Sequence, residues 1–252
     1  MAYWEEHMKK KMMSGLATLA FVAPAVLAAQ ADTRPTVAVM SFNNNVLGAN
    51  AADYAPLGTG VSDLMITELV RNPGIRVVER AQLDALMKEQ DLGASGRVDA
   101  ATAARLGRLL GAKHMIMGDI TTDMDPRTRA PNTVTVHVRA VDTETSQIIS
   151  LGDRMRGRPD DLMSLLLQAT ERAAAALRLP AIPAGPSRDA ANAATEKGKK
   201  VPFQTVLLYS RALNAADNGN KAEAISLYKQ ALEKYPDHEQ SKAALAKLES
   251  AR

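Results

Sequence analysis

The alternating segment TVTVHVRAV, residues 133–141, constrains the fold of this chain more than any other stretch. Valine occupies every second position, so that Val134, Val136 and Val138 share one face of an extended strand, with Ala140 next in the series. Strand-like runs precede it as HMIMGDI and follow it as QIISLGDRMRG, and residues 142–146 form a short hairpin loop before the last run. These three runs predict the middle of a β-sheet.

Upstream of this segment, strand-like and helix-like patterns alternate, which predicts an α/β fold. TVAVMSF, residues 36–42, is expected to be a buried first strand that Asn43, Asn44 and Asn45 end, because asparagine tolerates turn conformations. A second strand is expected at IRVVE, residues 75–79. Helices are expected from about Gly58 to Arg71, up to about Asp91, from an N-cap at Asp99 to Gly111, and after an N-cap at Asp160 or Asp161. The sequence therefore predicts one domain from about residue 34 to 179, with a five-stranded mixed sheet covered by four helices.

The first 31 residues have the order of a secretory signal peptide. Lysines 9–11 precede an apolar stretch over residues 12–27, and Ala29-Gln30-Ala31 offers a cleavage site after Ala31. The apolar stretch is shorter than the roughly 20 residues of a spanning helix, so we expect cleavage, with an uncleaved N-terminal anchor as the alternative. Cysteine is absent, which excludes disulfides and a lipid-bearing cysteine. The sequence predicts a periplasmic protein that is not a lipoprotein.

Proline marks a boundary in the C-terminal part of the chain. Residues 180–202 contain Pro180, Pro183, Pro186 and Pro202 among small and charged residues, with few apolar anchors for packing. This composition predicts a linker between the α/β domain and the last segment, residues 203–252.

The segment LLYSRALNAADNGNKAEAISLYKQALEKYPDH resembles one tetratricopeptide repeat, and a helix over residues 239–251 resembles its capping helix. Leu208 stands where the motif usually has Trp, and Arg211 where it has Leu; a solitary helical hairpin is the alternative. The residues on the small, turn, aromatic and proline positions of the motif are Ala212, Gly219, Ala224, Tyr228, Ala231 and Pro236.

One such repeat cannot bury its own apolar face, because repeats of this kind depend on stacked neighbours. A partner is therefore expected: the α/β domain, a second copy, or another protein. The resemblance places Tyr209, Leu213 and Ala216 on the concave stripe, where they are candidate protein-binding residues.

Residues 36–179 resemble the CsgG family, whose best-known member is the outer-membrane curli secretion channel. The resemblance rests on a strand that ends in Glu79-Arg80, on a following helix with Leu83 and Leu86, and on Gly118-Asp119-Ile120 before a hairpin with a Thr-rich turn. It implies the α/β fold and a role in the cell envelope. Peptidoglycan-synthase activators, flagellar T-ring components and the N-terminal domain of TolB have a similar fold, so the fold alone leaves the function open.

The channel of this family crosses the membrane with two hairpins per subunit, inserted after the third strand and after the next hairpin. A spanning strand needs about 9 to 11 residues, so a hairpin needs roughly 20. The corresponding connections here, residues 121–132 and 150–161, have only twelve residues each and carry prolines and charges. We therefore expect no integral membrane span.

Three histidines follow the signal region, His114, His137 and His238, and their positions lack the spacing of metal ligands. Each is expected to be structural or solvated. The motif Leu57-Gly58-Thr59-Gly60 precedes a helix and offers backbone N–H groups to an anion, but it lacks the Lys-Ser/Thr of a P-loop. A close approach of helix to sheet is the preferred explanation of these glycines.

Two further motifs contain charged residues that could take part in chemistry. Asp119, Asp123 and Asp125 alternate like cation ligands, but they lack the Gly and terminal Glu of an EF-hand, so a solvated acidic turn is expected. At the strand-to-helix junction, Glu79 is expected to accept from helix N-terminal donors and Arg80 to reach a carboxylate. No catalytic residue, cofactor or metal ion is expected.

These features predict a non-enzymatic exported scaffold or adaptor of cell-envelope assembly, of curli, flagellar or wall-synthesis type. Its partners are expected to be envelope proteins or a second copy of the chain, with peripheral outer-membrane association compatible with both. Basic and acidic residues, 31 and 28, are mixed along the chain, so no nucleic-acid partner is expected. The candidate protein-binding residues are Tyr209, Leu213 and Ala216, together with Asn43, Asn44 and Asn45 at the end of the first strand.

Two alternatives stand beside this prediction. The first is a subunit of a CsgG-type outer-membrane secretion channel. The second is a small-molecule or nucleotide-binding enzyme that uses residues 58–62.

Overall fold

A computed structural model describes residues 32–47, 51–92, 98–181 and 200–250. The chain from Arg34 onward forms one compact unit. The expected signal peptide with its cleavage after Ala31, and most of the expected linker, lie outside the described residues.

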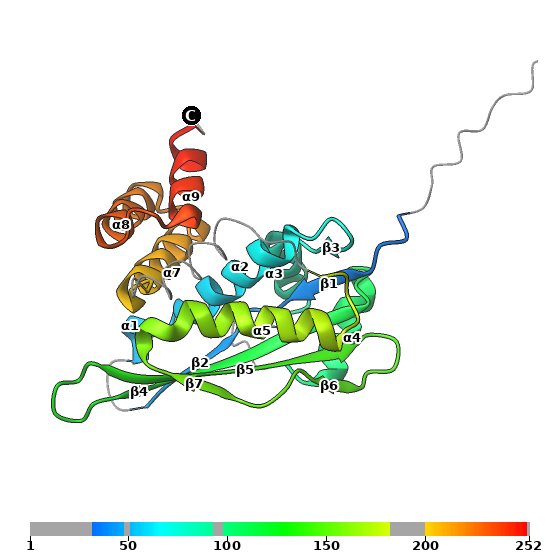
Figure 1. The fold of residues 1–252 in the computed structure, drawn as a ribbon. Coiled ribbons are helices and arrows are strands. Elements are labelled where there is room, and N and C mark those ends of the chain that lie inside the picture. The colour runs from blue at the N-terminus through cyan, green and yellow to red at the C-terminus, as the bar shows by residue number, and fades with distance from the viewer. Residues whose placement is uncertain (1–31, 48–50, 93–97, 182–199, 251–252) are drawn as a thin grey trace, which may run out of the picture. The chain divides into compact units, whose positions relative to one another are not determined.

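The strands of this unit form one mixed sheet (Figure 1). Their bounds are β1 Thr36–Val39, β2 Asn43–Leu47, β3 Arg76–Val77, β4 His114–Met124, β5 Pro131–Asp142, β6 Ile148–Ser150 and β7 Met155–Gly157. The order across the sheet is β3-β1-β4-β5-β6, with β2 also paired to β4 and β7 also paired to β5. The pairs made by β1 and β2 are parallel, whereas those made by β5 are antiparallel. The predicted α/β fold with a mixed sheet is confirmed.

The helices of the unit are α1 Ala51–Tyr54, α2 Leu57–Val70, α3 Arg80–Glu89, α4 Ala100–Leu109, the 3-10 turn η1 Pro159–Asp161, α5 Leu162–Ala176, α7 Phe203–Asp217, α8 Lys221–Lys234 and α9 Glu239–Ser250. The predicted N-cap of α4 is confirmed, since the Asp99 carboxylate accepts from the backbone N–H of Thr102 at 2.7 Å. Asp161 occupies the N-cap position of α5, as predicted, but its side chain makes no capping hydrogen bond to this helix. Asp161 accepts from the N–H of Arg158, and Asp160 accepts from the N–H of Phe203 at the start of α7.

Apolar clusters cover both faces of the sheet at the end where β1 lies. Ile116 packs in a cluster with α2 and α5, which also buries the predicted valine face of β5. Its neighbours Met115 and Met117 pack in a second cluster with α3 and α4. Successive side chains of a strand point to opposite faces, so one helix layer lies on each side (Figure 1).

The number of strands differs from the five predicted. QIISLGDRMRG forms two short strands, β6 and β7, because Gly152 between them adopts a positive φ of 104° that interrupts the pairing. The three asparagines 43–45 form β2, where the sequence predicts a turn, because they pair in parallel with Asp119, Ile120 and Thr121 of β4. Tertiary pairing overrides the local turn preference of asparagine here.

The β4–β5 hairpin is longer than predicted. The sequence places a loop over residues 121–132, but β4 continues to Met124 and β5 begins at Pro131, which leaves residues 125–130 for the turn. The Asp125 carboxylate closes this turn by accepting from the N–H groups of Arg127 and Thr128, both at 2.8 Å.

Helix α7 packs on the α/β part of the chain rather than standing apart from it. Val206, Tyr209 and Ala212 of α7 belong to the same apolar cluster as Val61 and Leu64 of α2. Of the three partners expected for the helical hairpin, the structure therefore provides the first, the α/β domain.

Candidate interaction site on the sheet

One face of the sheet changes from apolar to polar along the length of β4. Met115 and Met117 are buried under α3 and α4, whereas Asp119, Thr121 and Asp123, which follow on the same face, are only half-buried. The two helices thus cover part of this face, and the remainder is a solvated platform made by strands.

The strand register aligns further polar side chains with these three. Asp119 lies opposite His137 and Thr121 opposite Thr135 across the β4–β5 pair, and Asn43 and Asn45 of β2 flank them on the other side. We call this surface the open polar face. Its members are Asn43, Asn45, Asp119, Thr121, Asp123, Thr133, Thr135, His137, Arg139 and Arg156.

Hydrogen bonds and ion pairs hold the two carboxylates of the open polar face. Asp119 accepts from Asn43 Nδ2 at 2.8 Å and from Arg139 Nη1 at 3.4 Å. His137 Nδ1 lies 3.8 Å from the same carboxylate. These contacts fix side chains that would otherwise be mobile, and such preorganisation lowers the entropic cost of binding a partner.

Asp123 is held in the same way at the far end of the face. It accepts from Thr133 Oγ1 at 2.7 Å and from Arg156 Nη2 at 3.1 Å. The sequence predicts that Asp119 and Asp123 belong to a solvated acidic turn, which is wrong: both lie within β4 and are hydrogen-bonded across strands, and only Asp125 lies in the turn.

The predicted asparagine site is divided between the two faces of the sheet. Asn43 and Asn45 lie on the open polar face. Asn44 points to the opposite face and donates from Nδ2 to the backbone oxygen of Tyr54 at 2.5 Å. The alternation of polar residues in TVTVHVRA, notably Thr133, Thr135 and His137, is the sequence signal that could have identified this face.

The predicted repeat stripe faces the α/β part of this same chain. Tyr209 is 3% exposed, and its hydroxyl donates to Asp63 of α2 at 2.6 Å. Burial, together with the Asp63 carboxylate, raises the pKa of Tyr209 well above its usual value. Leu213 and Ala216 are partly buried against the same cluster. Helix α2 thus occupies the position that the sequence assigns to a partner protein, and the stripe and the asparagines do not form one site.

A second contact between α7 and the α/β part is centred on Arg80, the first residue of α3. Its guanidinium binds Asp217 of α7 through two hydrogen bonds of 2.7 and 2.8 Å. The same group reaches Asp84 at 3.1 Å and Asp63 at 3.4 Å. Burial alone would lower the pKa of Arg80, but these carboxylates raise it above its ordinary value, so the side chain stays charged. The prediction that Arg80 reaches a carboxylate is confirmed, with three such partners, Asp63, Asp84 and Asp217.

The prediction for Glu79 is wrong, because its side chain makes no capping hydrogen bond to α3. The glycines of α2 are close-packed against neighbouring segments. A Cβ on Gly58 would lie 2.0 Å from the backbone oxygen of Phe42, and one on Gly60 would lie 1.8 Å from Ser210 Oγ of α7. Gly58 thus permits the expected close approach to the sheet side, and Gly60 permits an approach of α7 that the sequence does not indicate.

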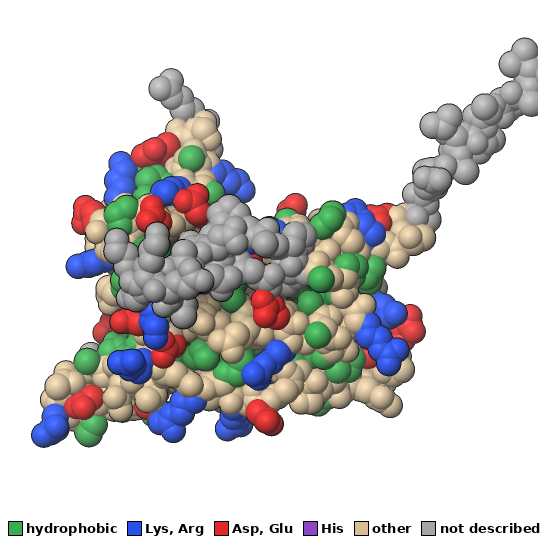
Figure 2. Space-filling view, viewed as in Figure 1, with side chains coloured by type: hydrophobic (Ala, Val, Ile, Leu, Met, Phe, Trp, Pro, Cys, Tyr) green, Lys and Arg blue, Asp and Glu red, His purple; other side chains and the backbone are tan. Residues whose placement is uncertain are grey.

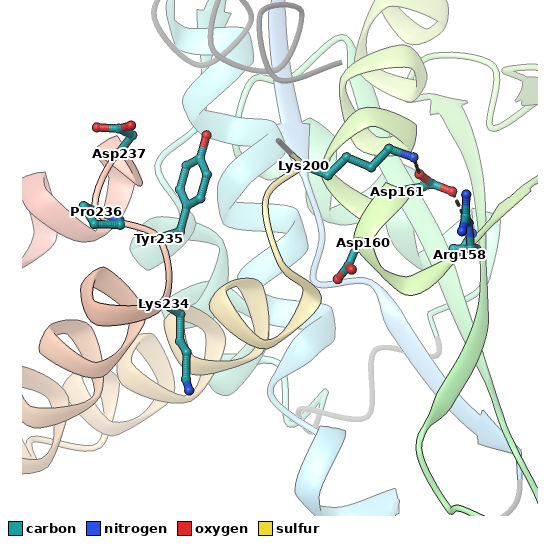
Figure 3. A pocket seen from close by; sticks show the side chains of 8 residues that line it. All are labelled: Arg158, Asp160, Asp161, Lys200, Lys234, Tyr235, Pro236 and Asp237. Atoms are coloured by element: carbon teal, nitrogen blue, oxygen red, sulfur yellow. Dashed lines mark hydrogen bonds and ion pairs between the residues drawn. The ribbon is translucent and has the colours of Figure 1, made fainter. Parts of the chain in front are cut away.

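Two cavities lie away from the open polar face. A cavity of about 370 Å³ at the end of β1 is lined by residues that include Met40, Arg80 and Asp217. A larger one of about 590 Å³ lies between the start of α5 and the turn after α8. Lys200, which pairs with Asp161, and Tyr235 are among its lining residues (Figure 3). On the surface visible in Figure 2, basic and acidic side chains are interspersed.

The sequence of this chain matches one known protein family. The model of the family described as "Curli production assembly/transport component CsgG" matches residues 19–153, more than half of the chain. The chain belongs to the CsgG family. The matched segment contains β1 to β6 and α1 to α4, and with them every member of the open polar face except Arg156. Helices α5 and α7 to α9 follow after the matched residues, so the tetratricopeptide resemblance stays a prediction.

Several solved structures resemble this CsgG-family chain at low identity. The LpoB C-terminal domain from Salmonella enterica is 18% identical, covering 49% of this chain and 80% of that one, with a TM-score of 0.36. Lipoprotein GNA1162 from Neisseria meningitidis is 15% identical, covering 56% and 98%, with a TM-score of 0.38. TolB from Acinetobacter baumannii is 14% identical, covering 58% and 29%, with a TM-score of 0.39. Among curated proteins, none matches the chain.

No helix in the described ranges is both long and apolar enough to cross a membrane. In the same ranges, no cluster of three or more His, Asp or Glu side chains could hold a metal ion. Of the three histidines, His114 and His238 are buried and His137 lies on the open polar face.

Proposed function

We propose that this CsgG-family chain is a non-enzymatic, exported scaffold or adaptor of cell-envelope assembly, and that it binds a partner protein across the open polar face. The observation that carries the proposal is the contrast between the two ends of one sheet face. Helices α3 and α4 bury Met115 and Met117, whereas Asp119, Thr121 and Asp123 are left accessible and ordered.

The organisation of the chain supports this role. A signal peptide over residues 1–31 with cleavage after Ala31, an α/β domain over 34–179, a linker over 180–202 and a repeat-like hairpin over 203–252 make up the proposed arrangement. Export to the periplasm agrees with the assembly and transport described for the family. The outer surfaces of α8 and α9 provide room for a second contact, since α8 packs mainly on α7 and α9.

Site-specific photo-crosslinking tests the proposal in the producing cell. A photoreactive amino acid replaces Thr135 or Asn45, both on the open polar face, in the full-length chain. The matched control replaces Ala175, which is exposed on α5. We expect one discrete protein adduct from both test positions and none from the control. Adducts that are absent at Thr135 and Asn45, or equally abundant at Ala175, would contradict the proposal.

A subunit of a secretion channel is the second candidate, because the description of the matched family includes transport. The two candidates differ in where the protein resides. The adaptor is expected to leave the membrane fraction after a high-salt wash of a sucrose-gradient preparation. A channel subunit is expected to stay with the outer membrane and to run as a detergent-resistant ring.

A further inference from the structure

A hollow of about 260 Å³ lies within the open polar face. It is lined by Asn45, Asp119, Thr121, Thr135, His137 and Arg154. The side chains come from β2, β4 and β5, and from the segment that connects β6 to β7. We call it the Arg154 hollow.

The Arg154 hollow contains polar side chains that can donate hydrogen bonds to a bound group. Within the described part of the chain, the side chains of Asn45, Thr121 and Thr135 make no side-chain hydrogen bond, so their amide and hydroxyl groups are available. The single carboxylate, Asp119, already accepts from Asn43 and Arg139. A bound acceptor can therefore receive hydrogen bonds from these three side chains.

The charges of the surface lead to the same conclusion. Arg139 pairs with Asp119, and Arg156 pairs with Asp123. Arg154 makes no ion pair with any residue in the described ranges and is exposed at the rim of the hollow. Arg154 is thus available to pair with a bound anion, beside the three uncharged side chains that can donate hydrogen bonds. A planar guanidinium binds a carboxylate through two parallel hydrogen bonds.

We propose that the Arg154 hollow receives the carboxylate of an Asp or Glu side chain from the docking segment of a partner protein. This inference rests on the proposed function, since it names the chemistry by which the open polar face recognises its partner. Leu47, 57% exposed at the end of β2, lies on the same face and provides an apolar contact beside the carboxylate. An acidic segment with a neighbouring aliphatic residue fits this surface.

The test is an NMR titration of the ¹⁵N-labelled full chain with an acetylated hexaglutamate peptide. We expect saturable shifts of the backbone amides of Asn45, Thr121 and Thr135. Arg154→Ala is expected to weaken the peptide at least about tenfold, which corresponds to the loss of one charge-assisted pair. The matched control is Arg127→Ala, an exposed arginine in the β4–β5 turn, which is expected to change the affinity less than about twofold.

Three results would overturn the inference. The first is equal weakening by both substitutions, since this indicates diffuse attraction rather than a site. The second is a shift map that avoids the hollow, or no saturable shift at millimolar peptide. The third is binding of inorganic phosphate as tight as binding of the peptide, because this indicates a site for small anions.

Crosslinking from Thr135 separates this inference from the proposed function. If the adduct forms in the native chain and is lost in Arg154→Ala, both are supported. If it persists undiminished in Arg154→Ala, the carboxylate inference fails and the adaptor stands. If the native chain gives no adduct, the proposed function fails whatever hexaglutamate does.

Discussion

At the scale of single residues, the buried His238 links the stability of the protein to pH. It is 2% exposed and precedes α9, where its Nδ1 accepts from the backbone N–H of Ser241 at 3.3 Å and lies 2.7 Å from Ser241 Oγ. Its Nε2 is buried and has no hydrogen-bond partner among the described residues, and the ring packs against Tyr209 with centroids 5.3 Å apart. Burial lowers the pKa of His238 to about 4.

We expect this histidine to make the protein acid-sensitive. A group whose pKa is lower in the folded than in the unfolded state binds more protons when unfolded, so its contribution is complete above the unfolded value near 6.5 and is lost as the pH falls toward 4. The loss amounts to about 2 kcal/mol by pH 5. Urea unfolding at pH 7 and pH 5 measures it.

The control is His238→Asn, which keeps a polar side chain before α9 but does not titrate in this range. The buried His114, whose pKa is also lowered by burial, is present in both chains and cancels. The difference between pH 7 and pH 5 is expected to shrink by about 2 kcal/mol in the variant. An unchanged difference would show that His238 is already protonated or accessible when folded.

At the scale of elements, the crossing of α2 and α7 depends on the missing side chain of Gly60. A Cβ there would lie 1.8 Å from Ser210 Oγ and 2.8 Å from Ser210 Cα, so the two helix backbones could not keep their separation. Tyr209 and Asp217, on the same side of α7, bind Asp63 and Arg80. A single glycine therefore sets the distance at which these polar contacts form.

Gly60→Val is expected to destabilise the chain by about 1–3 kcal/mol through overpacking. The matched control is Thr59→Val in the same helical turn, where the side chain is only half-buried. Ser210→Gly, combined with Gly60→Val, is expected to restore part of the loss. Urea denaturation of the native chain, Gly60→Val, Ser210→Gly and the double variant gives the coupling energy. Additive effects of the two substitutions would exclude contact between the helices at this point.

The elements differ in how far local sequence determines them. The valine face of β5 and the Asp99 cap of α4 follow from periodicity and short-range hydrogen bonding, and both are confirmed. The strand β2 was not predictable, because its asparagines favour turns and only the pairing with β4 extends them. The site shows the same division: alternation identifies Thr135 as solvent-facing, but the burial of Tyr209 depends on a helix more than a hundred residues away.

At the scale of the whole molecule, the helical hairpin and the α/β part share one apolar core. Val206, Tyr209 and Ala212 lie in the same cluster as the sheet residues Ile116 and Val136. The compact unit from Arg34 onward is not divided at the proposed linker. We therefore expect cooperative unfolding of the two parts.

A chain that ends at residue 181 tests this expectation. It is expected to melt at least about 2–4 °C lower than the full chain, since loss of the α7 contacts removes more than about 1 kcal/mol. It is also expected to bind a hydrophobic dye at the uncovered surface of α2. Addition of a fragment with residues 200–252 is expected to reverse both effects. A chain ending at residue 236, which lacks only α9, serves as the milder control. An unchanged melting temperature on loss of α7 would show that the parts fold independently.

The packing of α7 on α2 also determines how two binding surfaces of the molecule are oriented relative to each other. A molecule bound to the strands and a molecule bound to the outer helices would be held in a fixed relative orientation. The buried Tyr209 and the Arg80–Asp217 pair fix this orientation, because they hold α7 against the α/β part. Inserting or deleting residues between positions 182 and 199 should therefore not change this orientation. Only a substitution in the contact of α7 with α2 and α3 should reorient one bound molecule relative to the other.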